Sequence, residues 1–221
     1  MSPLRIAVLA SGGGTNLQAL MDEEKRRGKE SPYTIVCVIV DRKNTGAEER
    51  AEGAGIPCRA ALLGSRFSPE EISRMDGTRK RVERSNMVLG VCGEFGVEAL
   101  ALAGYLSILA GPLVEAYAGR ILNLHPALLP DFGGEGMWGR RVHEAVLASG
   151  RRESGCTVHL ADSGCDTGAI ILQKRCPVLP GDTPETLAQR IAPLEHEAIV
   201  EAVLLLAAKG GAGFSPGLHF S

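Results

Sequence analysis

Residues 4–16, LRIAVLASGGGTN, decide the fold of this chain. The apolar run 4–10 has the length and continuity of a strand buried on both faces, and the glycines that follow allow a sharp turn. From Leu17 onwards, apolar residues recur at helical spacing. A buried strand, a glycine turn and a helix in direct succession predict the first unit of a parallel α/β sheet.

The rest of the chain continues this alternation. We expect further strands at 34–40, 98–103 and 121–125, and helices at 47–54, 112–117, 139–149 and 183–209. A charged helix is expected to begin after Ser68, which has the properties of a helix cap, but the pattern does not fix its end beyond residue 85.

Two strands expected near the C-terminus, 156–160 and 169–173, are joined by a link too short for a crossover helix, so they should run antiparallel. The fold class is therefore α/β. We predict a single doubly wound, mostly parallel sheet with a Rossmann-like N-terminal half and an antiparallel extension near the C-terminus.

Composition excludes several functional classes. The chain has 221 residues, of which 44% are hydrophobic, and this favours one sizeable domain. A net charge of −2 offers no broad basic surface, so neither nucleic acid nor a membrane is expected as a partner. No apolar run reaches transmembrane length, and the N-terminus lacks the pattern of a signal peptide, so we expect a cytoplasmic protein.

The six cysteines contain no Cys-x-x-Cys pair. Scattered cysteines in apolar surroundings are typical of buried free thiols in a reducing compartment. We therefore predict neither a disulfide framework nor a metal site. The cysteines are Cys37, Cys58, Cys92, Cys156, Cys165 and Cys176.

A polar pair ends the strand expected at 121–125. Asn123 and His125 are two residues apart, so their side chains should share one face of the strand, while Leu122 and Leu124 point into the opposite layer. Pro126 cannot continue the hydrogen-bonded ladder. Sites in open α/β sheets form at the carboxyl ends of strands, so Asn123 and His125 are candidate functional residues, with Asp166 downstream as a third.

The glycine turn at 11–16 favours binding of a phosphate, because its N–H groups can converge beside the start of a helix. It is not a P-loop, since the Gly-Lys-Ser/Thr ending is absent. It also departs from the dinucleotide pattern, because Leu17 stands where a third glycine is required. Asp41, after the second strand, stands where a ribose-binding acid is expected, which keeps a dinucleotide-dependent oxidoreductase as an alternative.

These motifs together resemble the folate-dependent formyltransferases. The similarity rests on SGGGTNLQ at residues 11–18, NLHPALLP at 123–130 and Asp166. The glycine turn followed by Thr-Asn-Leu-Gln makes the chain most similar to the members that act on glycinamide ribonucleotide in purine biosynthesis. The resemblance implies a formyltransferase domain over residues 1–209, followed by a glycine-rich C-terminal tail at 210–221 that we expect to be loose.

By this resemblance, the chain transfers a formyl group from the cosubstrate 10-formyltetrahydrofolate to the amine of glycinamide ribonucleotide, without a metal, as a monomer or homodimer. The catalytic residues implied are Asn123, His125 and Asp166. The acceptor-binding residues implied are Gly14, Thr15, Asn16 and Glu195. The folate-binding residues implied are Leu106, Ser107, Ile108, Leu109, Asn123, Asp162, Ser163, Gly164, Cys165 and Asp166.

The residue types suit this chemistry. Formyl transfer to an amine passes through a tetrahedral oxyanion, to which the Asn123 amide and a protonated His125 can donate hydrogen bonds. Asp166 can orient His125 or take a proton from the attacking amine through water. Another phosphorylated or nucleotide-sugar amine as acceptor, formyltetrahydrofolate hydrolysis and a non-enzymatic binding protein remain as alternatives.

The sequence departs from the family pattern at two places. Many members have an arginine where Ser107 stands, so a cation for the glutamate tail of folate is missing there. The loop 132–141 is long and rich in glycine, which indicates a flap over the folate site. Arg140 or Arg141 is a candidate replacement cation, and Trp138 either stacks on the pterin or packs the flap down.

The other histidines are interpreted mainly as structural. His159 is expected to face the core or the sheet edge, and His143 to lie on a helix face. The position of His196 beside Glu195 leaves its role open.

Overall fold

Residues 2–214 of the chain are described by a computed structural model. Strand β1 (Leu4–Ala10) lies inside a seven-stranded sheet of order β3-β2-β1-β4-β5-β6-β7, as its continuous apolar sequence predicts. The other strands are β2 (Tyr33–Val40), β3 (Cys58–Ala60), β4 (Ala99–Leu102), β5 (Ile121–His125), β6 (Glu153–Leu160) and β7 (Ile170–Pro177). The short edge strand β3 is absent from the sequence prediction, because three residues carry no clear alternation.

Strands β1 to β5 pair in parallel, whereas β6 pairs antiparallel with both β5 and β7. The strand order reverses between β2 and β4, which flank β1. This confirms the doubly wound, mostly parallel sheet with an antiparallel extension. The point of reversal opens a crevice at the carboxyl ends of β1 and β4.

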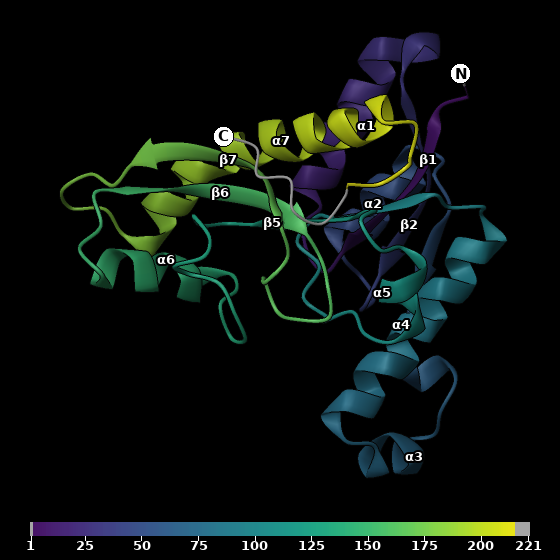
Figure 1. Cartoon of the computed structure of the whole chain (residues 1–221). Coiled ribbons are helices and arrows are strands. Elements are labelled where there is room, and N and C mark those ends of the chain that lie inside the picture. Colours follow the sequence, from purple (N-terminus) through teal and green to yellow (C-terminus); the bar gives the residue numbers. More distant parts are fainter. Residues whose placement is uncertain (1, 215–221) are drawn as a thin grey trace.

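Helices cover both faces of the sheet. Alternate residues of β1 contribute to two hydrophobic cores, one shared with α1 and α7 and the other with α4 and α5. In Figure 1, α1 and α7 lie above the sheet, and α4 and α5 lie below it. The helices are α1 (Thr15–Arg27), α2 (Gly46–Gly53), α3 (Pro69–Arg74), α4 (Gly77–Glu94), α5 (Pro112–Ala116), α6 (Arg140–Ala148) and α7 (Pro184–Ala208), with short 3₁₀ turns at Gly28–Glu30 and Leu63–Ser65.

The charged helix predicted after Ser68 is in fact two helices. Ser68 caps α3 as expected, but α3 ends before Met75, whose side chain is buried. The Asp76 carboxylate then accepts a hydrogen bond from the Arg79 N–H (2.7 Å) and starts α4. Helix α4 continues through Gly90 because its far end packs between the sheet and α5.

The C-terminal segment up to residue 214 is packed, contrary to the expectation of a loose tail. Phe214 is buried, and its N–H donates to the Gly119 carbonyl (2.9 Å). The remaining tail residues, 215–221, lie outside the described part of the chain. No helix within residues 2–214 has both the length and the apolar character that crossing a bilayer requires.

The glycine turn after β1 is held against the start of α2. The Gly12 carbonyl accepts a hydrogen bond from the Ala47 N–H (3.1 Å), and the Gly13 carbonyl accepts one from the Arg50 side chain (2.9 Å). Gly14 has a φ of 72°, and a Cβ there would lie 2.7 Å from the Ala47 Cα. Glycine is therefore required at position 14 both by the backbone conformation and by close packing.

We expect Gly14→Ala to lower the free energy of unfolding by roughly 3 kcal/mol, because left-handed strain and a steric clash act together. The control is Gly55→Ala, at a φ of 70° with no atom within 4 Å of the added Cβ, where strain acts alone and about 1 kcal/mol is expected. Urea unfolding of both variants measures the difference. Equal losses of unfolding free energy in the two variants would show that the close contact of the new Cβ with Ala47 does not destabilise the protein.

Candidate active site

Strand β5 delivers Asn123 and His125 to one end of the sheet. Leu122 and Leu124 pack in the core shared with α1 and α7, so Asn123 and His125 point to the opposite face, as the alternation predicts. The His125 side chain is buried, and its Nε2 lies 2.7 Å from the Phe132 carbonyl oxygen. Because a carbonyl only accepts hydrogen bonds, Nε2 carries the proton of this contact.

His159 belongs to the same cluster. In the antiparallel register, Asn123 lies opposite His159 and His125 lies opposite Thr157, so all four side chains share one face. His159 Nε2 lies 2.9 Å from Asn123 Nδ2. His159 is buried, as the sequence interpretation held, but its ring also lines the cavity described below. Alternating polar residues at 157 and 159 are the signal that could have identified it.

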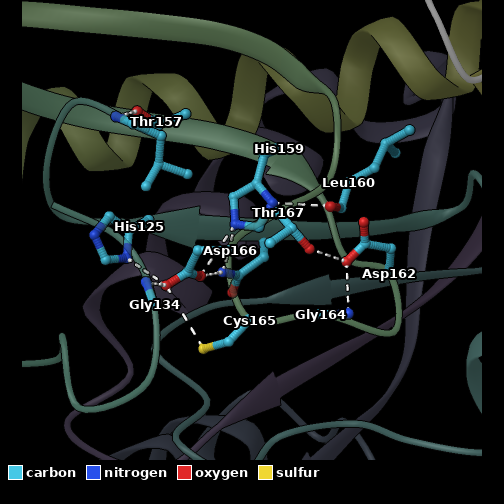
Figure 2. A network of polar contacts seen from close by, with 12 residues as sticks. His125, Gly134, Thr157, His159, Leu160, Asp162, Gly164, Cys165, Asp166 and Thr167 are labelled. Carbon is cyan, nitrogen blue, oxygen red and sulfur yellow. Dashed lines mark hydrogen bonds and ion pairs between the residues drawn. The ribbon is translucent and has the colours of Figure 1, made fainter. Parts of the chain in front are cut away.

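Asp166 joins these residues from the loop between β6 and β7 (Figure 2). Its Oδ1 accepts a hydrogen bond from Asn123 Nδ2 (3.3 Å) and lies 3.4 Å from His159 Nε2, while its Oδ2 lies 3.6 Å from His125 Nδ1. Oδ2 also accepts a hydrogen bond from the Gly134 N–H (3.0 Å). The sequence candidates Asn123, His125 and Asp166 therefore converge, with His159 added.

The loop around Asp166 is fixed by a second aspartate. Asp162 Oδ1 accepts hydrogen bonds from the Gly164 N–H (2.9 Å) and the Thr167 hydroxyl (2.7 Å), and both contacts are drawn in Figure 2. Asp166 itself has a φ of 58°, a conformation that aspartate tolerates better than most residues. This tight turn directs the Asp166 carboxylate back towards β5.

A backbone hydrogen bond fixes one ring proton of His159. Its Nδ1 lies 2.8 Å from the Leu160 carbonyl oxygen and must therefore carry a proton. Nε2 lies 2.9 Å from Asn123 Nδ2 and 3.4 Å from Asp166 Oδ1, so it accepts from the amide in the neutral ring and donates to the carboxylate when the ring carries a second proton. With the neutral ring, both N–H bonds of the Asn123 amide are engaged, the shorter with His159 and the longer with Asp166.

Burial and charge act in opposite directions on the two titrating groups. Burial lowers the pKa of His125 below its ordinary value, and the negative charge of Asp166 only partly opposes this. Burial by itself raises the pKa of Asp166, but the contacts with His159, His125 and the Gly134 N–H outweigh it, so that pKa is lowered. At neutral pH, Asp166 is a carboxylate, and His125 in the unliganded protein is mainly neutral.

These side chains face a cavity of about 510 Å³. Twelve of the residues predicted from the sequence line it: Asn16, Leu106, Ser107, Ile108, Leu109, Asn123, His125, Asp162, Gly164, Cys165, Asp166 and Glu195. Gly14, Thr15 and Ser163 do not line it. The cavity also includes residues that sequence reasoning did not assign to the site, among them His143 and His159.

One end of the cavity lies beside the first turn of α1. Asn16 Nδ2 donates to Glu195 Oε2 (3.1 Å), which joins α1 to α7, and burial raises the pKa of Glu195 above its ordinary value. No side chain caps α1, and the N–H groups of a first helical turn have no acceptor within the helix. This end therefore presents N–H donors, an amide and a carboxyl group to a ligand.

The part of the cavity lining that contains Ser107 does not offer a free ribose-binding acid. The Ser107 hydroxyl donates to Asp41 Oδ2 (2.7 Å), and Arg42 Nε lies 3.0 Å from Asp41 Oδ1. The Asp41 carboxylate is thus buried and already partnered. This arrangement removes the main support for a dinucleotide-dependent oxidoreductase.

The loop that precedes α6 closes one side of the cavity. Trp138 lines the cavity and is 50% exposed, with the Arg141 guanidinium 5.4 Å from its ring centroid. Arg140 pairs instead with Glu144 and Glu185, and Arg81 of α4 pairs with Glu135. Arg140 is therefore directed away from the cavity.

Among residues 2–214, no group of three or more His, Cys, Asp or Glu side chains is arranged to hold a metal ion.

The chain is similar in sequence to known proteins along most of its length. The family model described as formyl transferase matches residues 4–203. The trifunctional purine biosynthetic protein adenosine-3 of Drosophila pseudoobscura pseudoobscura is 41% identical over 203 residues, which cover 92% of this chain and 14% of that protein. The chloroplastic phosphoribosylglycinamide formyltransferase of Arabidopsis thaliana is 37% identical over 199 residues, covering 90% of this chain and 64% of the relative.

Among solved structures, glycinamide ribonucleotide transformylase 1 from Symbiobacterium toebii superposes with a TM-score of 0.80 at 37% sequence identity. The match covers 94% of this chain and 89% of that one. This chain thus spans a small part of the trifunctional relative and nearly the whole of the solved enzyme.

We expect Asp166→Asn to lower the pKa of His125 further. Burial already favours the neutral imidazole, and the negative charge of Asp166 is what opposes it, so removing that charge shifts the balance towards neutrality. NMR titration of labelled histidine measures the effect. Asp131→Asn, which removes a surface ion pair with Arg151, should leave the His125 titration unchanged. A rise in the pKa of His125 would contradict this account of the site.

Proposed function

This chain belongs to the formyl transferase family, and on that premise we propose that it transfers the formyl group of 10-formyltetrahydrofolate to the amine of glycinamide ribonucleotide. The observation that carries the proposal is the contact of one carboxylate, Asp166, with Asn123, His125 and His159 at the wall of a single cavity. The glycinamide ribonucleotide acceptor is further supported by the names of the relatives.

Two parts of the cavity lining suit the two substrates. The acceptor's phosphate binds at the turn formed by Gly14, Thr15 and Asn16, where no side chain caps the first N–H groups of α1, and Glu195 contacts the glycinamide portion. The pterin lies between residues 106–109 and the loop 162–166, in which the Gly164 N–H donates a hydrogen bond to Asp162. The formyl carbon and the amine then meet beside Asp166.

In the reaction, the amine nitrogen attacks the formyl carbon, and the carbonyl oxygen becomes an oxyanion. Asn123 turns the N–H of its longer hydrogen bond, the one to Asp166, towards this oxygen. The ionised Asp166 accepts the proton of the amine through a water molecule. As the bond between the formyl carbon and the folate nitrogen breaks, that nitrogen takes up a proton. The amine loses one proton and the folate nitrogen gains one, so the reaction has no net uptake or release of protons.

His125 and His159 have different parts in this proposal. His125 faces Asp166 with Nδ1, so proton uptake at Nδ1 gives an imidazolium that stabilises the developing negative charge. Its low pKa means that this state forms as charge accumulates and not in the resting protein. His159 is a positioning residue, because it holds the Asn123 amide in place.

The remaining assignments are also proposals. We assign the activity to one domain, residues 1–209, followed by the tail at 210–221, and the family match to 4–203 supports this division. All residues invoked come from one chain, so a monomer or a homodimer is sufficient, and the reaction needs neither a metal nor nucleic acid. Free thiols support a cytoplasmic location, although the Arabidopsis relative is named chloroplastic.

The decisive experiment measures formyl transfer from 10-formyltetrahydrofolate to glycinamide ribonucleotide. We expect turnover by the wild type, a fall in kcat/KM of about 10²–10³ for His125→Ala and a fall of about 10²–10⁴ for Asp166→Asn. Asp131→Asn, a surface carboxylate that pairs with Arg151, is the matched control and should retain wild-type activity.

The outcomes separate the alternatives. Release of tetrahydrofolate without acceptor indicates a hydrolase. Turnover only with another phosphorylated or nucleotide-sugar amine is consistent with the proposed catalytic residues but refutes glycinamide ribonucleotide as the acceptor. Activity that survives His125→Ala and Asp166→Asn refutes the proposed catalytic cluster.

A further inference from the structure

Asp41 is a buried carboxylate that the proposed reaction does not use. It follows the last residue of β2, and its side chain is 2% exposed. Burial by itself raises the pKa of Asp41, but hydrogen bonds from Arg42, Ser107 and Ser11 outweigh it, so that pKa is lowered. The carboxylate therefore stays ionised at neutral pH, and the side chains that contact it offset the cost of burying its charge.

Two of these partners come from segments that form the site. Ser107 belongs to the cavity lining, and its hydroxyl donates to Asp41 Oδ2 (2.7 Å). Ser11 begins the glycine turn, and its Oγ accepts a hydrogen bond from the Leu106 N–H (2.8 Å). Asp41 thus joins the end of a buried strand, directly and through Ser11, to the first two residues of the cavity wall 106–109.

The wall 106–109 has no regular secondary structure. No helix or strand includes residues 103–111, so a ladder of backbone hydrogen bonds does not set the shape of this segment. Three side-chain oxygens hold it instead, each through one hydrogen bond. They are Ser11 Oγ with the Leu106 N–H (2.8 Å), Asp41 Oδ2 with the Ser107 hydroxyl (2.7 Å) and Ser85 Oγ with the Ala110 N–H (2.9 Å). The Asp41 bond involves a charged group, and hydrogen bonds of this kind are the stronger ones.

The backbone of this wall is free to meet a ligand. Within residues 2–214, the N–H and carbonyl groups of 107–109 have no hydrogen-bond partner. These residues line the cavity, so their backbone groups are available to the donors and acceptors of a flat heterocycle. Hydrogen bonds weaken steeply as their angle departs from linear, so the affinity for such a ring depends on where the wall is held.

We propose that Asp41 is a positioning residue for the pterin: through Ser107 it holds the wall 106–109 at the place where the backbone meets the ring. This inference rests on the proposed function, since it concerns the same cavity. Asp41 is not part of the cavity lining, so it acts on the ligand only through the residues that it holds. The contact with Ser107 gives this carboxylate a task other than the ribose binding that its place in the sequence suggested.

A purely structural role for this carboxylate predicts a different result. Loss of a structural hydrogen bond lowers the free energy of unfolding and disturbs both parts of the cavity alike. Loss of a positioning hydrogen bond weakens the ligand that contacts 106–109 and leaves the ligand at the first turn of α1 unaffected. The affinities for the two proposed substrates therefore distinguish the two roles.

The test measures two dissociation constants by isothermal titration calorimetry, which does not require turnover. The probes are pteroic acid, which has the pterin and benzoyl groups of folate, and glycinamide ribonucleotide. We expect Ser107→Ala to weaken the binding of pteroic acid about tenfold and to leave the affinity for glycinamide ribonucleotide within about twofold of the wild type. Ser107→Thr keeps the hydroxyl and should retain the wild-type affinity for pteroic acid.

Asp41→Asn tests the other partner of the same hydrogen bond. The asparagine keeps one acceptor oxygen but no charge, so a loss of about threefold is expected for pteroic acid alone. In the double variant, the total loss should not exceed that of Ser107→Ala, because both changes act on one hydrogen bond. Ser65→Ala is the matched control: it removes a hydroxyl that donates to the Leu62 carbonyl outside the cavity, and it should bind both ligands as the wild type does.

Three results would overturn the inference. Ser107→Ala leaves the binding of pteroic acid unchanged, or it weakens both ligands equally, or the losses of the two single variants add in the double variant.

Failure of this inference is distinguishable from failure of the proposed function. Binding of pteroic acid that neither variant changes refutes the inference alone. A wild type that binds pteroic acid but not glycinamide ribonucleotide refutes the acceptor, and urea unfolding of the variants then replaces the second ligand as the measure of a structural effect. A wild type that does not bind pteroic acid refutes the folate site and the inference together.

Discussion

The antiparallel pairing of β6 with β5 is the constraint on which the site depends. It places His159 opposite Asn123 and Thr157 opposite His125, and it aims all four side chains at one face. The chain then turns between β6 and β7, and the same turn returns Asp166 to the end of β5. A shift of one residue in this register would turn His159 into the opposite core and leave the Asn123 amide without its partner.

The wall opposite Asp166 depends on the same pairing. The Thr157 hydroxyl donates to the Ala127 carbonyl (2.7 Å) and accepts from the Leu129 N–H (3.1 Å), which anchors the segment after β5. From that anchor the chain presents the Phe132 carbonyl to His125 and the Gly134 N–H to Asp166. Backbone groups therefore set the orientation of the two titrating side chains, and the loop 132–141 and the polar cluster of the candidate site form one connected network.

The sequence alone determined the sheet and the main residues of the candidate site. Residues 4–10 read as a buried parallel strand because no polar residue interrupts their apolar character apart from Arg5, near the strand's start. The alternation within 121–125 correctly separated Asn123 and His125 from Leu122 and Leu124, because a strand has a period of two. These inferences succeed because they depend on local periodicity, which a chain carries along its own length.

Only the tertiary structure decided which distant groups meet. The position of His159 beside Asn123 follows from a register between strands that are 28 residues apart, counted from His125 to Glu153, and no local pattern encodes that register. The hydrogen bond of Ser107 to Asp41 and that of the Ala110 N–H to Ser85 likewise depend on how α4 and the loop after β4 pack on the sheet. Charge partners are set by proximity in space, which the sequence determines only through the complete fold.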